Sequence, residues 1–149
     1  MVDIASRITH VLDPLSVDEI AEVVRLVRAS GTGTDRYLYS SVELLEPPKA
    51  LVLAMEGGSP NGQFDRVAKA VVIDQSERRN LEFFVSLTNG KLLERSVISA
   101  GQPPFTMPEI FSIETAVRQH DGFRAAMARR GVTDLDLCWI DPWTSGAYN

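Results

Sequence analysis

Few side chains in this 149-residue sequence have strong potential for chemistry: two histidines, His10 and His120, one cysteine, Cys138, and three tyrosines. An imidazole beside a thiol can generate a thiolate nucleophile, but a lone cysteine in a strand pattern is more often a small buried hydrophobe. Two isolated histidines and one cysteine cannot assemble a zinc cluster by themselves. We therefore predict no catalytic, cofactor-binding or metal-binding residue in the chain.

The common phosphate and nucleophile motifs are incomplete. Gly31-Thr32-Gly33 is G-x-G alone, with neither the rest of a dinucleotide fingerprint nor a preceding strand. The glycine-rich segment 57–62 lacks the Lys-Ser/Thr of a phosphate loop, and Ser145-Gly146 lacks a G-x-S-x-G elbow. These segments give no support to nucleotide binding or acyl transfer.

Composition predicts a folded, acidic protein of one domain or two small ones. Apolar residues make up 44%, and the formal charge is −5, so a packed core is expected and a nucleic-acid partner is not. No apolar run approaches the ~18 residues of a membrane span, so no membrane partner is expected. The N-terminus lacks a signal-peptide pattern, which favours a cytoplasmic location.

The first expected element is a helix at about Val17–Ala29. Ser16 and Glu19 form an S-x-x-E capping box, in which each side chain satisfies a free backbone N–H. Gly31 fits a left-handed stop after the last turn. An apolar stripe at helical spacing follows the cap and predicts a helix lying on an apolar surface: Ile20, Val23, Val24 and Val27.

Strand patterns follow at residues 36–45, 64–73, 81–88 and 91–99, and the run 51–55 is too short to assign. Asn89-Gly90 is a strong hairpin signal, since both residues tolerate positive φ. Phe83 and Phe84 must point to opposite faces of their strand. We expect one to meet the helix and the other to lie at a domain contact. The pattern predicts an α+β fold with one helix on a four-stranded antiparallel sheet.

A second module is expected after the segment 100–104. Thr106 and Glu109 form another capping box, for a helix reaching about His120. Asp121 is expected to cap a short helix that Gly131 stops, and residues 135–139 alternate as a strand. Trp139 and Trp143 either close this module or form an exposed apolar patch. We predict domains at 8–100 and 101–149, the second a partial copy of the first.

Three segments resemble the copper amine oxidase family. Asp13-Pro14-Leu15-Ser16 is similar to the "DPLS" start of the family's second domain, and residues 41–49 match its S-V-E-L-x-E-P-P-K stretch. Residues 128–132 and 141–146 are similar to its "rRGi…DPWsaG" segment in the third domain. The three motifs have the family's order and fitting spacing, and the resemblance covers nearly the whole chain.

The resemblance implies cystatin-like N2 and N3 domains, each with a helix on an antiparallel sheet. In the family, a separate C-terminal domain carries copper, topaquinone and an aspartate base. It oxidises primary amines to aldehyde, ammonia and hydrogen peroxide, and the enzyme works as a homodimer. The copper site needs three histidines, two of them in an H-x-H pair, and the cofactor tyrosine lies in an Asn-Tyr-Asp/Glu setting. Tyr37, Tyr39 and Tyr148 do not match that setting, so no family catalytic residue or cofactor is assigned to this chain.

We therefore expect a non-catalytic scaffold region of a primary-amine oxidase. Its partners would be the missing C-terminal catalytic domain and, in the parent, a second subunit. The chain is expected to stop inside its second module. The alternative is a free-standing cystatin-like protein-binding module, although the inhibitory Q-x-V-x-G pattern is absent and Gln102-Pro103-Pro104 is not a match. A small α+β enzyme is a third class, for which the sequence offers no convergent acid–base pair.

Overall fold

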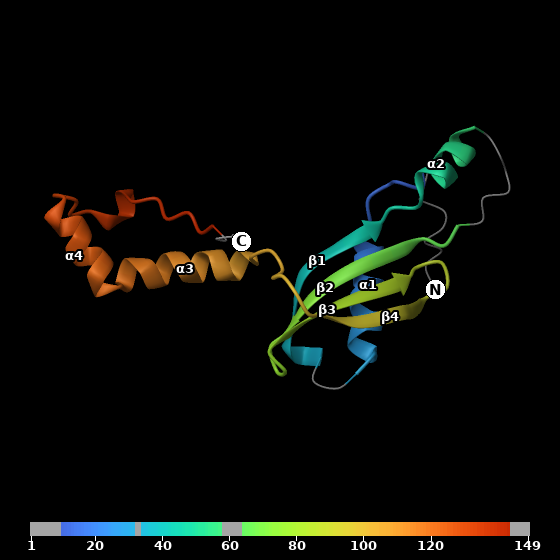
Figure 1. Cartoon of the computed structure of the whole chain (residues 1–149), viewed down its shortest axis with the longest axis horizontal. Coiled ribbons are helices and arrows are strands. Elements are labelled where there is room, and N and C mark those ends of the chain that lie inside the picture. The colour runs from blue at the N-terminus through green and yellow to red at the C-terminus, as the bar shows by residue number, and fades with distance from the viewer. Residues whose placement is uncertain (1–9, 32–33, 58–63, 144–149) are drawn as a thin grey trace. The chain divides into compact units, whose positions relative to one another are not determined.

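The computed structural model describes residues 10–31, 34–57 and 64–143. The chain divides into two compact units, residues 1–104 and 105–149, and each is described by itself. The first unit contains one long helix and a four-stranded sheet (Figure 1). Its elements are α1 (Val17–Ala29), η2 (Thr34–Arg36), β1 (Tyr37–Leu45), α2 (Lys49–Glu56), β2 (Val67–Asp74), β3 (Arg79–Ser86) and β4 (Lys91–Ile98).

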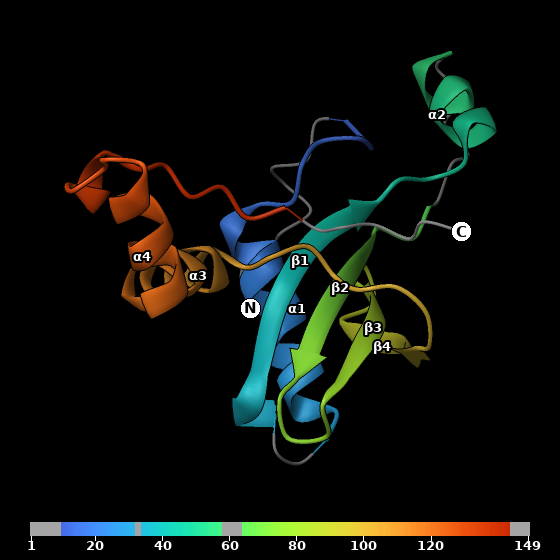
Figure 2. The same cartoon turned by 60° about the vertical axis from the view of Figure 1, so that its left-hand side comes forward.

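The sheet is the predicted antiparallel meander, in the order β1-β2-β3-β4. Helix α1 lies across one of its faces, as Figures 1 and 2 show from two directions. The four strands agree with the expected ones to within a few residues. Segment 64–66 is not part of β2, and the backbone N–H of Arg66 donates to the Thr88 hydroxyl at 2.9 Å. The predicted α+β architecture is confirmed.

Helix α1 begins and ends at the predicted residues. The carboxylate of Glu19 accepts from the Ser16 N–H at 2.8 Å, and the Ser16 hydroxyl accepts from the Glu19 N–H at 3.2 Å. Only the type of C-terminal cap differs from expectation: the cap is Ser30, in right-handed conformation, and Gly31 does not have positive φ. The Ser30 hydroxyl donates to the Val27 carbonyl at 2.7 Å, so a side chain closes the last turn without left-handed backbone.

The face of α1 that meets the sheet is narrower than the predicted stripe. Its buried residues are Glu19, Val23 and Val27, which recur every four positions. Ile20 is 36% exposed, because it lies at the margin of this row. The apolar pattern placed Ile20 on the buried face, but the structure buries the charged Glu19 there instead.

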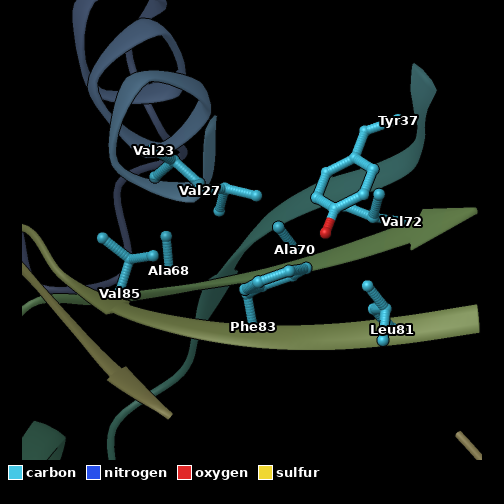
Figure 3. Close-up of a cluster of buried hydrophobic side chains, with 9 residues drawn as sticks. All are labelled: Val23, Val27, Tyr37, Ala68, Ala70, Val72, Leu81, Phe83 and Val85. Carbon is cyan, nitrogen blue, oxygen red and sulfur yellow. The ribbon is translucent and has the colours of Figure 1, made fainter. Parts of the chain in front are cut away.

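The core of the first unit lies between α1 and the sheet (Figure 3). Phe83 is fully buried there, with its ring centroid 6.2 Å from that of Tyr37. Phe84 is half-buried and, as the neighbouring strand residue, points to the opposite face. The cluster consists of Val23, Val27, Tyr37, Ala68, Ala70, Val72, Leu81, Phe83 and Val85.

Two connections refine the expected loops. The run 51–55 belongs to α2, whose first turn places the Leu51 N–H 2.8 Å from the Pro48 carbonyl. In the β3–β4 hairpin only Gly90 of the Asn89-Gly90 pair has positive φ, +58°. Ser86 and Lys91 are paired across it, so the loop has four residues and Asn89 keeps ordinary backbone geometry.

The second unit contains α3 (Met107–Gln119), α4 (Asp121–Arg129) and η3 (Leu135–Leu137). The carboxylate of Glu109 accepts from the Thr106 N–H at 2.7 Å, at the predicted start of α3. Helix α4 is capped by His120 rather than Asp121, since the His120 Nδ1 accepts from the Phe123 N–H at 3.4 Å. Gly131, with φ of +76°, ends α4 as expected.

The predicted strand at 135–139 is wrong. Residues 135–137 form a 3-10 turn in which the Cys138 N–H donates to the Leu135 carbonyl at 3.1 Å. A strand needs a neighbouring strand to satisfy its backbone groups, and the described part of this unit contains none. The assignment of 101–149 as a partial N3-like copy stays a prediction.

Candidate functional site

The residues with chemical potential are divided between the two units. His10 belongs to the first unit, whereas His120 and Cys138 belong to the second. Each histidine uses Nδ1 as a backbone acceptor: His10 from the Leu12 N–H at 3.2 Å, and His120 from the Phe123 N–H at 3.4 Å. Both imidazoles thus have local structural roles. Cys138 is half-buried.

The tyrosines near β1 also have structural roles. Tyr37 is buried in the core, and the Tyr39 hydroxyl donates to the Val24 carbonyl of α1 at 3.4 Å. Burial raises the pKa of Tyr39, which keeps the hydroxyl protonated as a donor. Tyr148 lies outside the described residues.

The first unit contains a buried ion pair that the sequence patterns did not predict. The Arg66 Nε donates to the Glu19 carboxylate at 2.5 Å, and their side chains are 4% and 1% exposed. The same guanidinium also donates to the carbonyls of Val11, Asp13 and Pro14, at 3.4, 2.9 and 3.3 Å. One side chain thus links the segment before α1 to the entrance of β2.

The Glu19 carboxylate is held in its ionised form. Burial alone would raise its pKa, but the hydrogen bonds from Arg66 and Ser16, together with the Arg66 charge, outweigh burial and lower the pKa. The signal in the sequence for the burial of Glu19 was its position four residues before Val23, which places both side chains on the same face of the helix. Nothing in the local sequence marks Arg66 as its partner, because the two are 47 positions apart.

The sheet face opposite α1 mixes apolar and charged side chains. Strand register places Val71 opposite Glu82, and Lys69 between Glu43 and Phe84. The Lys69 ammonium lies 3.0 Å from the Glu82 carboxylate and 4.0 Å from that of Glu43. The hydrogen bond to Glu82 raises the pKa of Lys69. The Lys69 ion pairs therefore lie among apolar side chains of the same face: Leu38, Leu45, Val67, Val71, Ile73, Phe84 and Ile98.

The second unit exposes both of its tryptophans. Trp139 is 88% exposed and Trp143 is 83% exposed. No residue within 105–143 is buried. Arg118 holds the segment after α4 on α3, donating to the carbonyls of Leu135 and Cys138 and to the Glu114 carboxylate. Of the two expectations for the tryptophans, the exposed one is therefore observed.

The described residues do not provide a clear catalytic constellation. They contain no cluster of three or more His, Cys, Asp or Glu side chains able to hold a metal ion. None of their helices is long and apolar enough to cross a membrane. What the geometry defines is an α+β domain with one helix on an antiparallel sheet, held by an apolar core and a buried ion pair.

Comparison with known proteins identifies the family. The sequence profile of the copper amine oxidase N2 domain matches residues 10–98. The chain is 35% identical to a primary amine oxidase of Arthrobacter sp. (strain P1), over 95% of this chain and 21% of that protein. It is 31% identical to a peroxisomal copper-containing diamine oxidase of Nicotiana tabacum, over 94% of this chain and 22% of that protein.

A solved structure agrees in fold. The copper-containing benzylamine oxidase from Hansenula polymorpha matches 80% of this chain with a TM-score of 0.66 and 20% identity, over 19% of its own chain. The chain belongs to the copper amine oxidase family, and residues 10–98 match its N2 domain. It spans about a fifth of the length of the curated relatives it matches.

The residues present do not fit the family's copper. Imidazole nitrogen is a suitable copper ligand, but the sequence has two histidines and no H-x-H pair. His10 has its Nε2 3.6 Å from the Glu56 carboxylate, and His120 caps α4. Two histidines without an H-x-H pair fall short of the family's three copper ligands, so no chemical step through copper is assigned to this chain.

Proposed function

We propose that this chain is a non-catalytic N-terminal scaffold region of a copper-dependent primary-amine oxidase. The observation that carries the proposal is the match of residues 10–98 to the N2 domain, in a chain that spans about a fifth of its relatives. The parent reaction would be oxidative deamination of primary amines, with copper and topaquinone in a separate catalytic domain. Homodimer formation and a cytoplasmic location are further parts of this proposal.

The two exposed surfaces support a scaffold role. The apolar residues around Lys69 on the outer sheet face and the exposed Trp139 and Trp143 are candidates for contact with the rest of a parent enzyme. Neither surface contains a convergent acid and base positioned for catalysis. Their chemistry fits docking of another protein surface better than turnover of a small molecule.

The activity test uses the full chain with added copper and a primary amine such as methylamine or benzylamine. Peroxide release is followed, with catalase added to a parallel sample as a control. We expect no turnover, whereas the Arthrobacter primary amine oxidase serves as the positive control. Copper-dependent, catalase-sensitive peroxide formation by this chain alone would refute the non-catalytic assignment.

The docking test uses calorimetry with the remainder of the Arthrobacter enzyme, from which the matching segment has been removed. We expect binding that weakens with Phe84→Glu on the outer sheet face. Val17→Glu is the matched control, because Val17 is 82% exposed on α1 and lies outside that face. Equal weakening by both variants, or no binding by the folded wild-type chain, would contradict the scaffold proposal.

A further inference from the structure

The segment 10–14, here called the strap, lies just before α1 and has its own compact turn. The His10 N–H donates to the Asp13 carboxylate at 2.8 Å, and the Asp13 N–H donates to the His10 carbonyl at 3.0 Å. The Leu12 N–H donates to the His10 ring at 3.2 Å. Val11 is buried at 5% exposure. The strap is therefore an ordered piece of the unit, although it lies outside every helix and strand.

Arg66 fastens this strap through several donors of a single guanidinium. Its Nη1 donates to the Val11 carbonyl, and its Nη2 donates to the carbonyls of Asp13 and Pro14. Its Nε and Nη2 also donate to Glu19, at 2.5 and 3.2 Å. Only the planar fork of arginine offers donors in all these directions, because a lysine ammonium concentrates its charge and three donors at one atom.

Arg66 and the strap both lie outside the apolar core. Arg66 precedes the first residue of β2, and it is not a member of the apolar cluster between α1 and the sheet. The strap carbonyls that it binds take no part in the sheet ladder. The bonds to these carbonyls therefore support the strap without forming part of the packing of Val23, Val27 and Phe83.

We propose that Arg66 is an internal latch for the strap, and that the strap opens as a local unit while the helix-on-sheet core stays folded. In the closed state the latch sets the direction from which the chain enters α1. In the open state the backbone of residues 10–14 and the Val11 side chain become accessible. This is a conformational device at the entrance of the domain, independent of the proposed scaffold role.

The test is amide hydrogen exchange on the full chain, comparing wild type with Arg66→Lys. In Arg66→Lys we expect strap amides, such as those of Leu12 and Asp13, to exchange at least about tenfold faster, the factor implied by losing one charged hydrogen bond. Amides of the β2 and β3 core are expected to keep their wild-type rates. Arg79→Lys is the matched control, since Arg79 pairs with Asp74 at 3.3 Å at the other end of the sheet.

A second variant, Glu19→Gln, weakens the latch from the other side while keeping the shape of the side chain. It should raise strap exchange in the same pattern as Arg66→Lys. Unchanged strap exchange in both variants would overturn the proposal. An equal rise in strap and core exchange would also overturn it, because Arg66 would then support the whole domain rather than a separable strap.

Discussion

Replacement of Phe83 by alanine should test the assignment of the two sheet faces. Phe83 is fully buried, its ring is tilted by 48° against Tyr37, and the Arg95 guanidinium lies 5.9 Å from its centroid. Truncation of a buried phenylalanine to alanine costs about 3–5 kcal/mol. This range already includes the lost contacts with neighbouring side chains. A small domain is stable by roughly 5–15 kcal/mol, so Phe83→Ala should remove a large part of the free energy of unfolding.

The matched control is Phe84→Ala, one position along the same strand. Phe84 is half-buried on the outer face, so we expect a loss near the ordinary value of about 1 kcal/mol. The assay is urea unfolding followed by far-ultraviolet circular dichroism, because both tryptophans lie in the other unit. Equal losses for the two variants, or a larger loss for Phe84→Ala, would refute the assignment of Phe83 to the core.

Three further predictions follow from individual residues. The folded state lowers the pKa of Glu19. The ion pair with Arg66 therefore stabilises the fold in full at any pH above the unfolded-state pKa of Glu19. This stabilisation is lost as the pH falls through the lowered, folded-state pKa. Urea midpoints from neutral to acidic pH should therefore fall more steeply in wild type than in Glu19→Gln; parallel curves would contradict this. Gly90→Ala should cost about 1–2 kcal/mol, because its φ is +58°. Gly31→Ala should be neutral or stabilise by up to about 1 kcal/mol, since its φ is not positive and no atom lies within 4 Å of an added Cβ. Equal changes in melting temperature for Gly90→Ala and Gly31→Ala would refute this contrast. Trp139 and Trp143 should emit like free tryptophan amide and be readily quenched by iodide, whereas blue-shifted, protected emission would show that both are covered in solution.

Local sequence was sufficient for features that depend on neighbouring residues. The Ser16–Glu19 and Thr106–Glu109 caps predicted both helix starts, because a capping box joins groups three positions apart. Alternation from Leu81 to Val85 predicted a half-buried strand, since successive side chains point to opposite faces. The family motifs at residues 13–16 and 41–49 also led to the family that the comparison identifies.

The failures occurred where a distant partner decides the local structure. Residues 135–139 alternate like a strand, but a strand also needs a ladder partner, and the described second unit has none. The segment became a 3-10 turn held by Arg118, whose donors reach the carbonyls of Leu135 and Cys138. Similarly, Gly31 resembled a left-handed stop, but the Ser30 hydroxyl closes α1 without one.

The sequence by itself determined the helix-on-sheet fold, the family and the small number of residues suited to chemistry. Only the tertiary structure decided that Glu19, predicted as the capping-box partner of Ser16, is also buried against Arg66, 47 positions away. A buried carboxylate is stable when a charge and enough hydrogen-bond donors surround it. Those donors come from the entrance of β2 and from the start of α1, which folding alone brings together.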